Sequence, residues 1–243
     1  MKNTTLAAAQ QAKMARLCQK LALTANDHVL EIGTGWGAMA IFMAKEYGCK
    51  VTTTTISPAQ YAFTKTQIER HQLTEQITLL QQDYRQLTGQ FDKVVSIEMI
   101  EAVGEAYLTG FIKICQARLK PKGLLALQCI TIADPRYHTY SQRLDFIQTH
   151  IFPGGFLPSI SVLVAKSQQH TQFVLKDVKD IGLDYARTLQ DWRQRFESHL
   201  SVYPSMGLDP YFIRMWRFYF CYCEAGFLTE NVSAVQLLFS RQD

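Results

Sequence analysis

The chain has 243 residues, of which 47% are hydrophobic, and its formal net charge is +4. This length is enough for one large α/β domain with a sizeable core, and the composition is that of a globular protein rather than a disordered one. The mildly basic charge fits weak attraction to an anionic membrane surface and gives no reason to expect a nucleic-acid partner. The first residues are polar and no apolar run approaches about 18 residues, so we expect a cytoplasmic protein without a signal peptide or a membrane span.

The six cysteines show no spacing typical of a metal site. Cys221 and Cys223 are too close together for a zinc knuckle, and most of the cysteines lie in apolar runs. The others are Cys18, Cys49, Cys115 and Cys129. We therefore predict buried free thiols in a reducing compartment and no metal-binding residues.

The first predicted element is an amphipathic helix over residues 4–23. Lys13, Arg16 and Lys20 form its basic face, which we expect to be solvated. That face is the part of the chain best suited to a weak, salt-sensitive contact with anionic lipid.

Residues 29–37 organise the rest of the chain. The apolar run 29–32 predicts a buried parallel strand, and residues 38–46 carry apolar side chains at helical spacing. The glycines between them leave space for a ligand because they lack a Cβ atom. Their spacing, G-x-G-x-G, differs from the G-x-G-x-x-G of dinucleotide-binding proteins and resembles motif I of S-adenosylmethionine (SAM) dependent methyltransferases. We therefore predict a cofactor site, rather than a plain turn, formed by Glu31, Gly33, Gly35, Trp36 and Gly37.

The second predicted strand, residues 50–56, ends without the acidic residue that many nucleotide-binding proteins direct at the ribose hydroxyls. Ser57 and Pro58 then suit the start of a helix that runs to about residue 71. A ribose partner at this strand end must be a hydroxyl or an amide. We therefore predict cofactor contacts from the residues around this strand end, Thr55, Ile56 and Gln60.

The third predicted strand, residues 77–80, is followed by Asp83 and Tyr84. This pair suits adenine, because the carboxylate accepts a hydrogen bond from the exocyclic amine while the ring stacks on the base. Asp83 is equally suited to cap the turn that follows it, and the pair alone leaves both interpretations open.

Two glutamates, Glu98 and Glu101, follow the fourth predicted strand, residues 91–97. They lie at the carboxyl end of a central strand, where open sheets bind ligands. Alternatively, Glu101 stabilises the N-terminus of the helix predicted over residues 105–119 through the helix dipole. A fifth strand at residues 124–132 completes an alternation of strands and helices, which predicts a doubly wound, mostly parallel α/β sheet.

The pattern changes after residue 132. Residues 133–170 mix aromatic residues with Pro and Gly, which suits a lid, an apolar substrate wall or simple packing on the core. The second of two later helices has aromatic side chains almost all round. It is therefore either a buried core helix or a helix with one face on an apolar pocket. The elements predicted after residue 170 are a strand at 171–178, helices at 184–200 and 209–226, and a strand at 232–240.

Stretches spread over most of the chain resemble the cyclopropane-fatty-acyl-phospholipid synthase family, which includes the mycolic acid cyclopropane synthases. Trp36 in the glycine turn and the segment 55–60, TISPAQ, are far more specific than the glycines alone. The other matching stretches are residues 9–13, 31–37, 82–85, 96–101, 151–155 and 184–185.

The resemblance implies the Rossmann-like methyltransferase fold, with seven strands of which the last is antiparallel. Residues 1–243 would form one domain, in which an apolar insertion of helices and loops, about 133–170 and 184–226, forms the acyl-substrate region. In the implied reaction, SAM donates a methyl carbon to the cis double bond of an unsaturated phospholipid acyl chain, and loss of a proton closes a cyclopropane ring. An alkene is a poor nucleophile and the intermediate is a carbocation, so such a site needs alignment, dry aromatic walls and a base.

In this family the base is thought to be a bound bicarbonate. Carried over by position, its holders here are Glu101, Tyr185, Gln128 and the backbone of Ile130. Bacterial members often carry His at the position of Gln128, and an amide can hydrogen-bond the anion but cannot titrate. From the basic first helix and the net charge we also expect peripheral contact with the inner membrane face.

Two other functions stay open at the level of the sequence. One is a methyltransferase of the same fold that acts on a small amine or another soluble acceptor. The other is a catalytically silent protein that binds SAM or lipid and transfers nothing. An acyl chain bound in an apolar pocket would argue against the first. The product is also open, since a ring, a methyl branch and a methylene branch share the first cation.

Overall fold

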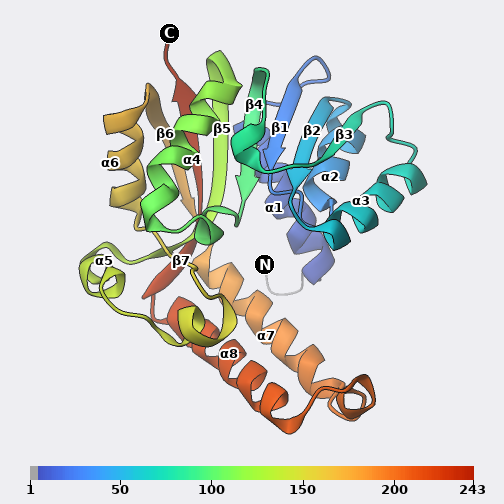
Figure 1. Cartoon of the computed structure of the whole chain (residues 1–243), viewed down its shortest axis with the longest axis vertical. Helices are drawn as coiled ribbons and strands as arrows, with labels where there is room; N and C mark the ends of the chain where they lie inside the picture. Colours follow the sequence, from blue (N-terminus) through green and yellow to red (C-terminus); the bar gives the residue numbers. More distant parts are fainter. Residues whose placement is uncertain (1–4) are drawn as a thin grey trace.

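A computed structural model describes residues 5–243 and contains one seven-stranded sheet (Figure 1). The strand order is β3-β2-β1-β4-β5-β7-β6, and β7 runs antiparallel to both of its neighbours. The remaining pairs are parallel, which confirms the predicted doubly wound sheet with an antiparallel last strand. The strands are β1 His28–Ile32, β2 Lys50–Thr55, β3 Ile77–Gln81, β4 Phe91–Ile97, β5 Leu119–Ile132, β6 Phe173–Asp180 and β7 Val232–Arg241.

Helices cover both faces of the sheet. Successive residues of a strand point to opposite faces, so Leu30 of β1 packs with α4 and α6 while its neighbour Val29 packs with α1, α2 and α3. The helices are α1 Leu6–Lys20, α2 Ala38–Tyr47, α3 Pro58–Arg70, α4 Glu105–Arg118, α5 Asp134–Ser141, α6 Ile160–His170, α7 Gly182–Ser198 and α8 Pro210–Leu228. Single turns are η1 Tyr84–Gln86, η2 Ile100–Ala102, η3 Ile147–Ile151 and η4 Tyr203–Met206.

The segment 133–170 is more regular than its sequence suggested, and it divides into two parts. Its last part, α6, packs on the main core through Leu163, whose side chain is fully buried. The earlier part instead contacts α8, where Phe146 meets Phe218 and Phe152 meets Tyr219. Of the alternatives for this segment, packing on the core describes α6, whereas the residues before it lie beside α8.

Helices α7 and α8 form an antiparallel pair that extends beyond the carboxyl ends of the central strands (Figure 1). Phe220 and Phe227 of α8 are buried, Phe220 against Phe196 of α7, whereas Tyr211, Phe218 and Tyr222 are exposed. The interpretation of α8 as a buried core helix is therefore wrong. Its aromatic residues serve two surfaces, one against α7 and one open to solvent.

The predicted basic face of the first helix is only partly solvated. Lys20 forms an ion pair with Asp177 of β6, and only 12% of its side chain is exposed. Lys13 and Arg16 are half-buried. The charge of α1 therefore serves in part to attach the helix to the sheet.

Within residues 5–243, every helix is too short or too polar to span a lipid bilayer. The cysteines are free thiols, and Cys18, Cys49, Cys115 and Cys129 are buried as expected. Cys221 on α8 is exposed, which differs from the prediction of buried thiols. No group of three or more His, Cys, Asp or Glu side chains in this part of the chain could hold a metal ion.

Candidate active site

The glycine turn after β1 adopts a backbone that only glycine adopts easily. Gly33, Gly35 and Gly37 all have positive φ, at 96°, 54° and 84°. A Cβ atom on Gly37 would lie 2.7 Å from Cγ2 of Thr64, so this glycine also lets α3 approach the turn. A Cβ atom on Gly35 would meet nothing within 4 Å. Gly35 therefore borders open space, as expected if a ligand lies against the turn.

A chain of hydroxyl groups connects β2 to the base of this turn. Thr53 donates to Oε2 of Glu31 at 2.6 Å, and the hydroxyls of Thr53 and Thr34 lie 2.6 Å apart. Burial raises the pKa of Glu31 to about 8 despite the hydrogen bond from Thr53. With 2% of its surface exposed, Glu31 supports the turn from within the sheet. Its predicted contact with a cofactor would therefore be indirect.

Two of the predicted ribose partners contact each other. The hydroxyl of Thr55 donates to Oε1 of Gln60 at 2.7 Å, which joins the end of β2 to the first turn of α3. Ile56 lies beside them with 73% of its surface exposed. Trp36 is 58% exposed and meets Phe63 edge-to-face at 5.3 Å. These side chains lie at or after the ends of β1 and β2, which are neighbouring parallel strands, and their cofactor contacts stay predictions.

Asp83 caps the turn that follows β3. Its side chain accepts from the backbone N–H of Arg85 and pairs with the Arg85 guanidinium at 2.6 Å. This hydrogen bonding holds the pKa of Asp83 below its usual value. Tyr84 meets Phe111 of the core edge-to-face at 5.4 Å. The capping role of Asp83 is thus present in the structure, while the predicted adenine contact of this pair stays a prediction.

Glu98 stands at the carboxyl end of β4 and receives two side-chain hydrogen bonds. Nε2 of Gln128 donates to its Oε1 at 2.7 Å, and the hydroxyl of Tyr185 donates to its Oε2 at 3.0 Å. The three residues come from β4, β5 and α7, so the carboxylate joins the sheet to the α7–α8 pair. The sequence singled out Tyr185 and Gln128 as partners of Glu101, whereas the structure directs both of them to Glu98.

Glu101 lies one turn further along and uses its carboxylate differently. The backbone N–H of Ile130 donates to Oε1 at 2.5 Å, while Oε2 is buried without a hydrogen-bond partner. Burial raises the pKa of Glu101 to about 7, against the lowering effect of the Ile130 hydrogen bond. Because its hydrogen-bonded oxygen is directed at β5, the alternative role as a dipole partner of α4 does not describe its contacts.

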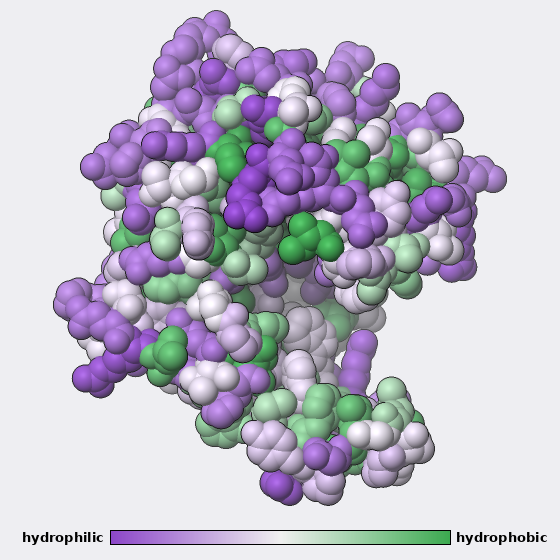
Figure 2. All heavy atoms as spheres, viewed as in Figure 1, coloured by the Kyte–Doolittle hydropathy of each residue, from purple (hydrophilic) through white to green (hydrophobic). Residues whose placement is uncertain are grey.

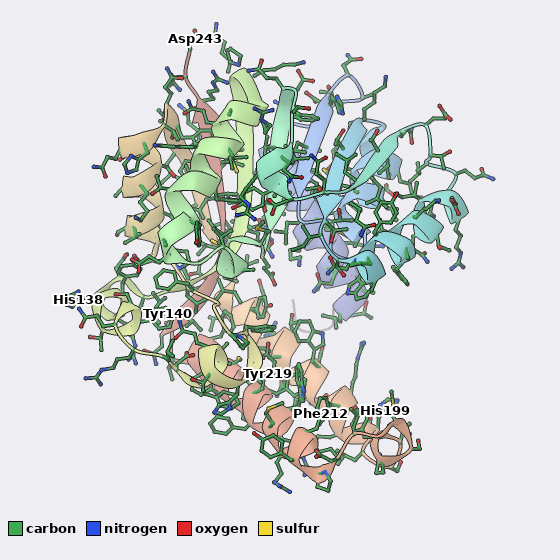
Figure 3. All side chains as sticks on the ribbon, viewed as in Figure 1. His138, Tyr140, His199, Phe212, Tyr219 and Asp243 are labelled. Carbon is green, nitrogen blue, oxygen red and sulfur yellow. The ribbon has the colours of Figure 1, made fainter. Side chains whose placement is uncertain are left out.

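Aromatic rings surround the two glutamates on the side away from the sheet. Tyr185 stacks on Phe227 at 4.7 Å, and burial with the nearby charge of Glu98 raises the pKa of Tyr185 well above its usual value. Trp216 meets Tyr219 at 5.0 Å, and its indole N–H is buried without a partner. Tyr219 lies where α8 passes the segment before α6 (Figure 3). The carboxylates therefore face a largely apolar wall.

The family model for mycolic acid cyclopropane synthetase matches residues 1–237. The chain belongs to this family. It is 35% identical over 239 residues to the tuberculostearic acid methyltransferase UfaA1 of Mycobacterium tuberculosis (strain ATCC 25618 / H37Rv), covering 98% of this chain and 56% of that protein. It is also 35% identical over 244 residues to the cyclopropane-fatty-acyl-phospholipid synthase of Escherichia coli (strain K12), covering 97% and 59%.

A solved structure of the mycolic acid cyclopropane synthase CmaA1, complexed with SAH and CTAB, shares the fold with a TM-score of 0.90 and 24% identity. The match covers 98% of this chain and 86% of that one. The chain spans less than two thirds of the length of the two curated relatives, at 56% and 59%.

A second feature of this cyclopropane synthetase family member is an apolar hollow at the far end of the α7–α8 pair. It measures about 440 Å³ and is lined by Trp192, Arg195, Phe196, His199, Val202, Tyr203, Met206 and Phe220. His199 lies at the tip of the pair, away from the sheet (Figure 3). Figure 2 shows a recess between the sheet and the α7–α8 pair. The arrowheads of β1 and β4 point towards that recess (Figure 1), and Met99, the residue after Glu98, packs within 3.3 Å of the position that a Cβ atom on Gly33 would take.

Sequence reasoning about the site missed the partners of Glu98 and one buried amide. Gln236 of β7 lies opposite Gln128 in the β5–β7 register, and its Nε2 donates to Oε1 of Gln128 at 3.0 Å. The same amide donates to the backbone carbonyl of Lys13 in α1 at 3.3 Å. An amide inside the otherwise apolar last strand was the available indication, because a buried amide requires partners.

Proposed function

We propose that the chain is a SAM-dependent methyltransferase that acts on the cis double bond of unsaturated phospholipid acyl chains and forms a cyclopropane ring. The observation that carries this proposal is the pair of glutamates, Glu98 and Glu101, held between the glycine turn and an aromatic wall. Proton loss from a carbocation requires a base inside a site that excludes water, and the carboxylates meet that need.

SAM would supply an electrophilic methyl group on a sulfonium centre. The open space at Gly35, bordered by the Thr55–Gln60 pair, suits its amino-acid and ribose parts. The rings of Tyr185, Tyr219 and Trp216 would exclude water and stabilise positive charge on the acyl chain. The complex of CmaA1 with SAH supports the choice of donor.

A bound bicarbonate does not fit the donors that the resemblance assigned to it. The amide of Gln128 and the hydroxyl of Tyr185 are directed at Glu98, and the N–H of Ile130 is directed at Glu101. An added anion would have to displace a carboxylate from the Tyr185 hydroxyl and from the Ile130 N–H, which each have a single proton to donate, and it would lie beside the carboxylate of Glu98. The proposed function therefore includes no step through bicarbonate.

The acyl chain would enter from the recess between the sheet and the α7–α8 pair. Exposed apolar side chains on the segment before α6 and on the α7–α8 pair with its connection include Leu144, Phe152, Met206 and Phe218. They favour peripheral contact with a membrane, from which an acyl chain of a phospholipid is within reach.

Incubation with labelled SAM and vesicles of an unsaturated phospholipid tests the proposal. We expect label in the acyl chains, recovered as a cyclopropane lipid on analysis of the extracted lipids. Vesicles of a saturated phospholipid are the matched control, because they offer the same headgroup without an alkene. Label transferred equally to both lipids, or to neither, would contradict the proposal. A methyl-branched or methylene-branched lipid would retain the enzyme class and change the product.

A further inference from the structure

We propose that Glu98 is the base that removes the proton on ring closure, in the place that the family gives to a bound anion. The inference rests on the proposed function and deepens it, because it assigns the deprotonation to a carboxylate of the chain itself. The direct observation is that donors of the kind that would hold such an anion converge on Glu98.

Two neutral donors fix the Glu98 carboxylate, one on each oxygen. The Tyr185 hydroxyl lies 3.0 Å from Oε2 and the Gln128 amide lies 2.7 Å from Oε1. A carboxylate oxygen has two lone pairs, so each oxygen keeps one with which to accept a proton. Because both donors are uncharged, the carboxylate is oriented without being neutralised by an ion pair.

The Gln128 amide is itself held in a single orientation. Its Oε1 accepts from Nε2 of Gln236 at 3.0 Å, and the two side chains are 1% and 0% exposed. This hydrogen bond occupies the carbonyl end of the amide, so its NH₂ end is the one available to Glu98. Gln128 and Gln236 are therefore positioning residues for the carboxylate.

The backbone at Glu98 adds a second, independent observation. Its φ is 50°, in the left-handed region that residues with a side chain disfavour. Its N–H nevertheless donates to the carbonyl of Gln128 at 2.7 Å, which fixes this conformation. Strained backbone is typical of functional sites, where the gain from placing a group outweighs the cost to the fold. Glycine would adopt this turn more easily, so the structure accepts strain to keep a carboxylate here.

Glu98 also lies between the glycine turn and the aromatic wall, where a base is needed. The next residue, Met99, packs within 3.3 Å of the position that a Cβ atom on Gly33 would take, so Glu98 is adjacent in sequence to a residue that touches the glycine turn. Tyr185, the hydrogen-bond donor to Glu98, belongs to the aromatic wall. A base at this point would face a substrate placed between the methyl donor and the wall.

Glu101 is less suited to the same task. One of its oxygens accepts from the backbone of Ile130, and the other is buried without a partner. Both glutamates are half-buried, but Oε1 and Oε2 of Glu98 are held by two side-chain donors, whereas Oε2 of Glu101 is enclosed without one. Glu101 is therefore fixed to β5 by one oxygen and enclosed at the other, and Glu98, held by side chains of β5 and α7, is the carboxylate that meets the substrate.

The proposed step balances in atoms and electrons. The methyl carbon of SAM forms a bond to one alkene carbon as its bond to sulfur breaks, which leaves S-adenosylhomocysteine and a cation on the other alkene carbon. Glu98 takes a proton from the added methyl group, and the electron pair of that C–H bond closes the third side of the ring. Glu98 becomes a neutral carboxylic acid and then loses the proton to water.

The experiment measures S-adenosylhomocysteine and cyclopropane lipid separately, with SAM and unsaturated phospholipid vesicles, in buffer freed of carbon dioxide and in the same buffer with added bicarbonate. We expect the natural chain to make ring at the same rate in both buffers. Glu98→Gln should lower ring formation about 10²–10⁴-fold, as loss of a positioned base typically does, with unchanged SAM affinity by calorimetry. Glu105→Gln is the matched control, since Glu105 also accepts from a tyrosine hydroxyl, that of Tyr137 at 2.8 Å, outside the site.

Glu98→Gly supplies a second readout, which is rescue by an added anion. A purely structural role of Glu98 would not produce such rescue. Glycine tolerates the positive φ, and the variant leaves the Tyr185 hydroxyl and the Gln128 amide facing a vacated space. We expect it to be inactive in carbon-dioxide-free buffer and to regain ring formation when formate or bicarbonate is added. Glu105→Gly should not respond to either anion.

Three results would overturn the proposal. The first is ring formation by the natural chain that stops without bicarbonate and returns with it. The second is full ring formation by Glu98→Gln. The third is a Glu98→Gly variant that binds SAM yet is not rescued by either anion, which would make Glu98 a structural link between β4, β5 and α7. A natural chain that binds SAM but makes no product in any buffer would instead reject the proposed function.

Discussion

At the scale of single residues, three glutamates at one edge of the sheet have three different environments. Glu31 is enclosed beneath the glycine turn and is bonded to Thr53. Glu98 is fixed by two neutral donors, and Glu101 is bonded to the backbone of β5. Glu31 therefore supports a turn, Glu98 offers a proton acceptor and Glu101 stabilises a strand. The hydrogen-bond donors around each carboxylate determine its role.

The open space at Gly35 gives the first prediction. Gly35→Val should abolish SAM binding, because a branched side chain would fill the space that the ligand needs. Calorimetric titration with SAM measures the effect. Gly89→Val is the matched control, since Gly89 also has positive φ and open space around it but lies in the turn before β4. An equal loss of SAM affinity in both variants would show that backbone strain, rather than a filled ligand space, causes the effect.

The raised pKa of Glu101 gives a prediction about stability and pH. The folded chain binds this proton more tightly than the unfolded chain, because burial raises the pKa from 4.5 to about 7. Its contribution to the free energy of unfolding therefore falls as pH rises from about 4.5 to about 7. Glu101→Gln removes that titration, so the variant should gain stability relative to the natural chain across this window, by at most about 3 kcal/mol.

Urea denaturation at pH 5 and pH 8 measures this difference. Burial also raises the pKa of Glu31, but Glu31 is present in both proteins, so its contribution cancels in the difference between their free energies of unfolding. A difference between Glu101→Gln and the natural chain that is constant with pH would show that Glu101 does not titrate in the folded state. We also expect Glu101→Gln to leave SAM binding intact.

At the scale of elements, the close packing of the start of α2 against α3 depends on the absence of a side chain at Gly37. A Cβ atom on Gly37, the residue that caps α2, would lie 2.7 Å from the methyl group of Thr64 on α3, and φ at Gly37 is 84°. Gly37→Ala should therefore destabilise the fold by about 1–3 kcal/mol through backbone strain and overpacking.

The two causes can be separated by a double-mutant cycle. Thr64→Ala in the Gly37→Ala background removes the contact and should restore the part of the stability lost to overpacking, but not the part lost to strain. Urea denaturation of the four proteins measures both parts. Strict additivity of the two substitutions would show that Gly37 and Thr64 do not interact.

Elements with strong periodicity were predictable from the sequence, and contacts between distant segments were not. The glycine turn, the cap at Ser57 and the alternation of strands and helices follow from local patterns, and β1 to β5 were correctly predicted apart from their ends. Helix α6 was missed because the Gly and Pro residues before it suggested a continuing loop. The pairing of Tyr185 with Glu98 joins residues 87 positions apart, and no local pattern specifies which of two glutamates a tyrosine reaches.

At the scale of the whole molecule, charge and apolar surface both bear on contact with a membrane. The pairing of Lys20 with Asp177 reduces the basic face of α1. Large exposed apolar side chains gather in the half formed by residues 142–157 and 183–228, where Met206 is 64% exposed and Phe218 is 52% exposed. We therefore expect membrane contact to combine weak electrostatic attraction with apolar insertion from this half.

The last prediction separates these two contributions by co-sedimentation with anionic vesicles. Binding of the natural chain should fall as salt rises but should not vanish, because screening weakens the charge term and leaves the apolar term. Met206→Asp combined with Phe218→Asp should lower the binding that survives high salt. Tyr107→Asp is the matched control, since Tyr107 is 65% exposed on α4, outside this half. Binding that disappears completely with salt, or an equal loss in the control, would assign membrane contact to charge alone.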